Sequence, residues 1–153
     1  MDLDFSNKNN RFNARAAAII YNNDKSKVLL FKVDDGRDFY ILPGGRIEFN
    51  EDSITAIKRE IKEELGWNLD YKLCSIQENF INVNGVNIMQ YCFCYKGIYC
   101  GDTNNKPFNC LDNKDQLFKW VEIKDIDNYK ILPLSIKRLI TSQNDCIEHI
   151  IEK

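Results

Sequence analysis

Three glutamates stand close together in the chain, since Glu60, Glu63 and Glu64 fall within five consecutive positions. Residues three and four positions apart share one face of an α-helix. Like charges placed in this way destabilise an isolated helix by about 0.2–0.5 kcal/mol per pair. A bound cation would remove that repulsion, and oxygen-only ligands suit Mg²⁺ or Mn²⁺ better than zinc. The spacing therefore indicates a site for a divalent metal ion.

The segment that carries these glutamates has the local signals of an amphipathic helix. Asn50 or Asp52 can cap its N-terminus, and Gly66 can turn the chain out of it. The apolar positions at helical spacing are Ile54, Ile57, Ile61 and Leu65. On a helical wheel the glutamates lie beside this apolar stripe. We therefore expect them at the rim of the packed face, where a cleft can form.

The octamer KREIKEEL (residues 58–65) also has the mixed charge of a solvated helix face. The wider spacing favours a metal site. The defining positions are Gly45, Glu51, Arg59, Glu60, Ile61, Glu63, Glu64, Gly66 and Trp67. This pattern resembles the Nudix box at every defined position, although Trp67 stands where an aliphatic residue is usual. The resemblance covers about residues 11–143 and identifies the chain as similar to the Nudix hydrolases.

The resemblance implies a loop–helix–loop that holds a divalent metal ion against a diphosphate. Glu60 and Glu64 correspond to the principal metal ligands, and Glu63 to a further ligand or a water-holding partner. The Gly44 carbonyl is a further oxygen ligand in this scheme. The implied cofactor is Mg²⁺, with Mn²⁺ as a substitute.

Four other positions take structural roles by resemblance. Glu51 and Arg59 correspond to an ion pair that steadies the loop against the helix, and Gly45 and Gly66 to the turns on either side. The predicted catalytic set is Glu63, Glu64 and Arg59.

The implied activity is that of a pyrophosphohydrolase acting on acid anhydrides. It would cleave a diphosphate linkage in a nucleoside diphosphate derivative or a nucleoside triphosphate, by metal-activated water. The general base stays open between Glu63, Glu64 and an aspartate of the later loop. The loop candidates are Asp102, Asp112 and Asp115.

The alternative is a catalytically inactive Nudix-fold module that binds nucleotides or regulates a partner. Such modules typically lose the acidic helix, which this chain keeps. The isoprenoid diphosphate isomerase branch of the fold needs additional histidine ligands, and His149 is the single histidine.

Substrate residues are expected around a cleft between the box, the N-terminal strands and the loop at residues 101–115. The candidate phosphate ligands are Arg15, Arg37 and Arg46, with Lys32 as a further cation. Phe39, Tyr40 and Phe80 are aromatic residues that could stack on a base. For each of these residues a surface charge or a core aromatic is the simpler interpretation.

Composition sets the broad class. The chain has 153 residues, is 44% hydrophobic and carries a net charge of −2, which indicates one domain with its own core and no broad nucleic-acid binding. An N-terminus without an apolar run favours a cytoplasmic protein. The six cysteines lack zinc-site spacing, so we expect reduced thiols. The isoleucines of the C-terminal tail can pack either on the domain or on a second subunit, so a homodimer stays open.

The coarse element pattern predicts an α/β fold, an α/β/α sandwich, and the resemblance adds a mixed central sheet. Strands are expected at residues 14–21, 27–33, 38–42, 69–81, 86–99 and 117–123, and helices after residue 50 and at 134–142. Turns are expected at 34–36 and 82–85, and Pro43-Gly44-Gly45 is expected to end the third strand. We expect residues 1–10 to be disordered, 11–143 to form the Nudix domain with its box at 45–67, and 144–153 to be a tail.

Overall fold

Strand β2 (Asn10–Asn22) forms the middle of the sheet and contributes to both layers of the core. The computed structural model describes residues 1–33 and 35–153. Ala14, Ala16, Ala18 and Ile20 point into one cluster of buried side chains, and Ala17, Ile19 and Tyr21 point into another. A continuous apolar run such as AAAIIY is typical of a strand that is covered on both faces.

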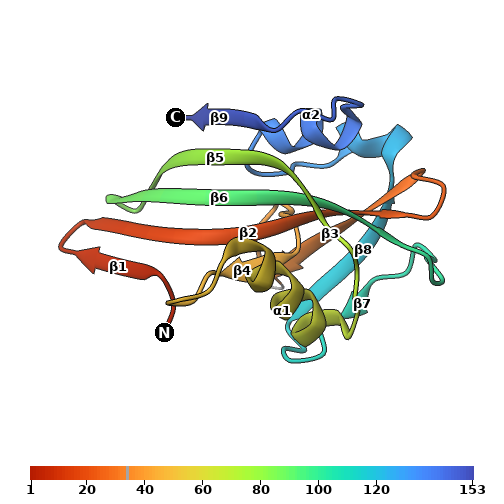
Figure 1. Cartoon of the computed structure of the whole chain (residues 1–153), viewed down its shortest axis with the longest axis horizontal. Coiled ribbons are helices and arrows are strands. Elements are labelled where there is room, and N and C mark those ends of the chain that lie inside the picture. Colours follow the sequence, from red (N-terminus) through yellow and green to blue (C-terminus); the bar gives the residue numbers. More distant parts are fainter. Residues whose placement is uncertain (34) are drawn as a thin grey trace.

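The sheet is mixed, as predicted (Figure 1). Its strands run in the order β7-β8-β3-β2-β6-β5-β9, and β1 and β4 also pair with β2. The remaining bounds are β1 Asp4–Asn7, β3 Lys27–Val33, β4 Gly44–Arg46, β5 Lys72–Val83, β6 Val86–Tyr99, β7 Phe108–Asn109, β8 Gln116–Glu122 and β9 Glu148–Glu152. The β2–β6 and β5–β9 pairs are parallel, whereas the other pairs are antiparallel.

Helices cover the two faces of the sheet and confirm the α/β/α sandwich (Figure 1). Helix α1 (Ser53–Leu65) packs into the first cluster, and α2 (Ser135–Thr141) packs into the second together with the 3₁₀ helix η1 (Ile123–Asn128). Within the described residues no helix is long and apolar enough to cross a membrane.

The N-terminal segment is ordered, so the prediction of disorder over residues 1–10 is wrong. Strand β1 pairs antiparallel with the start of β2, and the Leu3 amide donates to the Ile47 carbonyl at 2.8 Å. The Asp4 carboxylate accepts hydrogen bonds from Arg11 and Arg46, which fixes the strand against its neighbours. The residues that bind this segment lie across a turn in β2 or about forty positions further along the chain, at Arg46 and Ile47. The composition of residues 1–10 alone therefore does not predict that the segment is ordered.

The C-terminal tail also belongs to the domain. Residues 148–152 form β9, which pairs in parallel with β5, and Ile150 packs on the second cluster. The Glu148 carboxylate lies 2.7 Å from the Arg138 guanidinium, and Glu152 accepts from the backbone amide of Ser135 at 3.0 Å. Both contacts join the last strand to α2.

The predicted strand at 38–42 is replaced by two isolated bridges, Phe31–Ile41 and Tyr40–Ile131. Pro43-Gly44-Gly45 does not break the chain out of the sheet as expected, because Gly44 and Gly45 begin β4 and pair with β2. The hairpin between β5 and β6 turns at Asn84–Gly85 inside the predicted range. Asp34, part of the turn predicted at 34–36, lies outside the described residues.

Candidate active site

Helix α1 is held at both ends by the residues that the sequence marks as caps. The Asp52 carboxylate accepts from the Thr55 amide at 2.7 Å, and Gly66 adopts a left-handed conformation with φ +75°. Ile57 and Ile61 are fully buried against the sheet. Because the ends and the apolar face are fixed, the acidic side chains of the helix have defined positions.

Arg59 is the centre of a charged network between the loop and α1. Its guanidinium donates to both carboxylate oxygens of Glu51, at 2.8 and 2.9 Å, and to the Arg46 carbonyl at 3.0 Å. It also donates to Glu60 Oε1 at 2.9 Å. The expected pair of Glu51 and Arg59 is therefore present as a bidentate contact, the strong form of such a pair.

Gly45 makes room for the Glu60 carboxylate. A Cβ at Gly45 would lie 2.2–2.4 Å from the carboxylate atoms of Glu60, so any side chain there would push Glu60 aside. Gly44 has φ +138°, and a Cβ there would lie 2.2 Å from the Ala16 carbonyl oxygen. Gly45 thus brings the loop backbone directly against the acidic face of α1, and Gly44 brings it against the backbone of β2.

Glu64 is a buried carboxylate whose charge is not balanced. Its side chain is 8% exposed, and within the described residues Oε2 has no hydrogen-bond partner. Burial and the negative charges of Glu60 and Asp112 together raise the pKa of Glu64 to about 8, against the positive charge of Arg15, which lowers it. Burial also raises the pKa of Glu60, against the effect of Arg59.

Glu63 lies at the exposed rim of the site. Its side chain is about half exposed, with Oε2 3.4 Å from the nearest guanidinium nitrogen of Arg59. Among the loop aspartates, Asp112 is near enough for its charge to raise the pKa of Glu64, and it accepts from the Cys110 thiol at 2.7 Å. Asp102 and Asp115 are exposed side chains of the same loop.

The residues present fit a divalent metal ion. Glu64 offers a buried oxygen without a partner, and Glu60 lies one helical turn before it beside the Gly45 backbone. Within residues 1–33 and 35–153, no group of three acidic, histidine or cysteine side chains is arranged to hold a metal ion by itself. Mg²⁺ is commonly held by one or two carboxylates together with waters and substrate phosphates, so two glutamates and a backbone carbonyl suit it.

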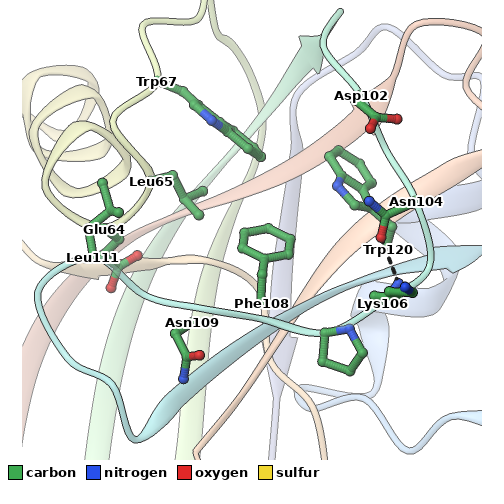
Figure 2. A pocket seen from close by; sticks show the side chains of 11 residues that line it. Glu64, Leu65, Trp67, Asp102, Asn104, Lys106, Phe108, Asn109, Leu111 and Trp120 are labelled. Atoms are coloured by element: carbon green, nitrogen blue, oxygen red, sulfur yellow. Dashed lines mark hydrogen bonds between the residues drawn. The ribbon is translucent and has the colours of Figure 1, made fainter.

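A cavity of about 420 Å³ lies between α1 and the loop before β8. Figure 2 shows Glu64 on its α1 side and Asp102 on the loop, with the rings of Trp67, Phe108 and Trp120 nearby. Trp67 stacks on Tyr99 with the ring centroids 3.7 Å apart. No local sequence pattern marks this aromatic stack, because Trp67 follows α1 and Tyr99 ends β6, and only the fold brings the two rings together.

A second cavity of about 540 Å³ lies on the α2 face and contains the three predicted phosphate ligands. Arg46 donates to Asp4 at 3.0 Å, and Arg37 lies 2.7 Å from Asp35. Arg15 donates to the Leu42 carbonyl at 2.9 Å, and in the described part of the chain no carboxylate pairs with it. The single cleft that the sequence predicted is therefore two cavities, one beside the loop and one beside the N-terminal strands.

The three aromatic residues predicted to stack on a base, together with Lys32, do not all lie at the same cavity. Phe39 and Phe80 line the second cavity, whereas Tyr40 packs edge-on against Tyr129 at 5.5 Å in the second cluster. Lys32 lies over the Tyr40 ring at 5.6 Å. Tyr40 and Lys32 thus contribute to packing rather than to the cavity wall.

Comparison with known families gives a match to the NUDIX domain over residues 12–141. The chain belongs to the Nudix family. A curated relative from Caenorhabditis elegans, named "Putative nudix hydrolase 1", is 35% identical over 121 residues, which are 76% of this chain and 30% of that protein. This Nudix chain therefore spans less than a third of the length of that relative.

Solved structures share the Nudix fold. A MutT protein from Bacillus halodurans is 18% identical with a TM-score of 0.69, covering 90% of this chain and 86% of its own. The dihydroneopterin triphosphate pyrophosphohydrolase of E. coli is 20% identical with a TM-score of 0.63, covering 83% of this chain and 91% of its own. An ADP-ribose pyrophosphatase from Streptococcus suis is 16% identical with a TM-score of 0.56, covering 92% of this chain and 98% of its own. At these identities the likeness concerns the fold.

Proposed function

We propose that this Nudix protein is a Mg²⁺-dependent hydrolase of a diphosphate linkage in a small nucleotide, either a nucleoside triphosphate or a nucleoside diphosphate derivative. The observation that carries the proposal is the Glu64 carboxylate, buried beside Glu60 with one oxygen unpartnered. A buried charge of this kind destabilises a fold unless a cation compensates it. Retention of the complete acidic face of α1 therefore supports metal binding.

Glu60, Glu64 and the Gly44 carbonyl would hold the ion. When bound, Mg²⁺ neutralises phosphate oxygens and lowers the pKa of a coordinated water. Arg59, which is occupied by Glu51 and Glu60, acts as a positioning residue for the carboxylates.

Arg15 is placed to hold a phosphate of the substrate. Its charge acts on both Glu60 and Glu64, and no carboxylate of the described residues neutralises it by direct pairing. The water's proton must pass to a carboxylate near the ion. Glu63 and Asp112 are the candidates that the geometry favours, because Glu63 lies on the exposed rim and the charge of Asp112 acts on Glu64.

The test measures the release of phosphate or pyrophosphate products from each compound of a panel, once with Mg²⁺ and once with EDTA. The panel contains nucleoside triphosphates, ADP-ribose and nucleotide sugars. The names of the structural neighbours include both a triphosphate and ADP-ribose as substrates, so the panel covers both classes. We expect Glu64→Gln to lower turnover at least a hundredfold, since the neutral amide is a poor metal ligand. Asp125→Asn, an acid-to-amide change at an exposed position of η1, is the matched control and should retain turnover.

The rival function is a module that binds nucleotide without cleaving it. Nucleotide binding without Mg²⁺-dependent release of product for any compound of the panel would favour the module and refute the hydrolase. A cytoplasmic location stays a prediction from the sequence, and a homodimer stays open.

A further inference from the structure

On the α2 face of the sheet, three neighbouring strands place polar side chains in two rows. Strands β2, β6 and β5 lie side by side, and their registers align the residues of each row. The first row is Asn13, Gln90 and Asn79; the second is Arg15, Cys92 and Gln77. All six line the cavity of about 540 Å³.

Two of these side chains are buried and have polar atoms that make no hydrogen bond within the part of the chain that the structure describes. Asn79 is 2% exposed, and within the described residues neither its Oδ1 nor its Nδ2 has a partner. Gln77 is fully buried and donates from Nε2 to Ser75 Oγ at 3.3 Å, which leaves its Oε1 without a partner. The neighbouring amide is satisfied, because Gln90 Nε2 donates to Asn13 Oδ1 at 2.8 Å.

An amide buried without partners destabilises a fold, and most buried polar groups in proteins are paired. Packing alone would be served by leucine or methionine at the same places. Since both unpartnered amides belong to the wall of one cavity, a polar ligand in that cavity is the explanation that accounts for both.

The free atoms define what such a ligand must offer. Asn79 presents a donor and an acceptor side by side, and Gln77 adds an acceptor. The complement is an acceptor next to a donor, with a second N–H nearby. Guanine has this pattern in O6, N1–H and its 2-amino group, and adenine has it in a ring nitrogen and its 6-amino group. Cytosine has it in N3 and its 4-amino group, whereas uracil and hypoxanthine lack the amino group.

We propose that this cavity binds the amino-bearing base of the nucleotide substrate, with Asn79 pairing to the base edge and Gln77 accepting from the amino group. The inference rests on the proposed function and specifies its substrate. The rest of the wall includes apolar side chains such as Ile41, Leu42 and Ile136, which suit the flat faces of a base. Side chains that cover the two amides must move aside as the base enters.

The position of Arg15 connects the cavity to the acidic face of α1. Arg15 and Gln77 share a row two strands apart, and neighbouring strands are separated by about 4.8 Å, so the backbone positions are about 10 Å from each other. A base at the amides therefore directs its phosphates towards Arg15. The charge of Arg15 in turn reaches Glu60 and Glu64.

The test compares ATP and GTP with UTP and inosine triphosphate under Mg²⁺. We expect kcat/KM to be at least tenfold higher for ATP or GTP than for either nucleotide without an amino group. Gln77→Leu removes the acceptor for the amino group and should abolish this preference through KM, whereas Asn79→Leu should raise KM for all four nucleotides. Both variants should melt at the same or a higher temperature, because unpaired buried groups are lost. Asn128→Leu, at an exposed position of η1, is the control.

Calorimetry with AMP and GMP in EDTA separates this inference from the hydrolase activity. Binding to the wild type and at least tenfold weaker binding to Asn79→Leu support the base site even if no nucleotide is hydrolysed. Three results overturn it: equal kcat/KM across the nucleotides, a preference for UTP or inosine triphosphate, or a Gln77→Leu variant that melts lower and keeps the preference. The last result would assign Gln77 a merely structural role.

Discussion

Replacement of Glu64 by glutamine should make the metal-free protein more stable while it abolishes activity. The pKa of this carboxyl lies near 4.5 in an unfolded chain and at about 8 in the native protein. Between these values the native state holds a proton that the unfolded state has released, so stability falls as the pH rises through this range. The loss, fully developed above pH 8, amounts to about 3 kcal/mol at pH 7.

Glutamine at this position removes the charge but leaves an amide in a place where Oε2 has no partner. The protonated carboxyl of the wild type leaves the same oxygen unpaired, so this cost of roughly 1–3 kcal/mol is common to both proteins, and the gain at pH 8 should approach the full loss of about 4 kcal/mol. For a domain of this size that corresponds to a rise in Tm of about 8–16 °C.

The assay is thermal unfolding of wild type and Glu64→Gln in EDTA at pH 5 and pH 8. At pH 5 the native carboxyl is protonated and ionisation of the unfolded state costs only about 1 kcal/mol, so the two proteins should melt within about 3 °C of each other. Addition of Mg²⁺ at pH 8 should raise the Tm of the wild type and leave the variant unchanged. A variant that melts below wild type at pH 8, or a difference that is equally large at pH 5, would refute the assignment of a buried charged carboxylate.

Three further changes test the surroundings of this carboxylate. Arg59→Ala removes the bidentate contact with Glu51 and should lower Tm by about 5 °C and reduce kcat; unchanged melting and kinetics would count against the ion pair. Gly45→Ala displaces the flexible end of Glu60, so Mg²⁺ affinity measured by calorimetry should fall at least tenfold while Tm changes by less than about 2 °C; a normal affinity would show that Glu60 does not bind the ion. The hydrogen bond from Arg11 lowers the pKa of Asp4 to about 2, so Asp4→Asn should be less stable than wild type in denaturant at pH 6, with a difference that shrinks as the pH falls from 4 towards 2; a constant difference would contradict the assigned pairing.

The local features of α1 were predictable from sequence because each depends on residues a few positions apart. The caps at Asp52 and Gly66 and the buried apolar stripe follow from helical spacing, and the hairpin follows from Asn84-Gly85. Family membership was predictable for the same reason, since the box is contiguous.

What the sequence could not show depends on pairing between distant segments. Strands β1 and β9 are short and polar, and their backbone hydrogen bonds go to β2 and β5. Asn79 and Gln77 look like ordinary strand residues until the register brings them beside Arg15. The division of the expected cleft into two cavities likewise depends on how the sheet is assembled.

Strand β2 connects the two layers of the core. Its alternate side chains are shared between the layer under α1 and the layer under α2, and its backbone pairs with four other strands. Neither helical layer can detach without exposing one side of this strand to water. We therefore expect the two layers to melt together, so that the acidic helix unfolds only when the opposite half of the molecule unfolds as well.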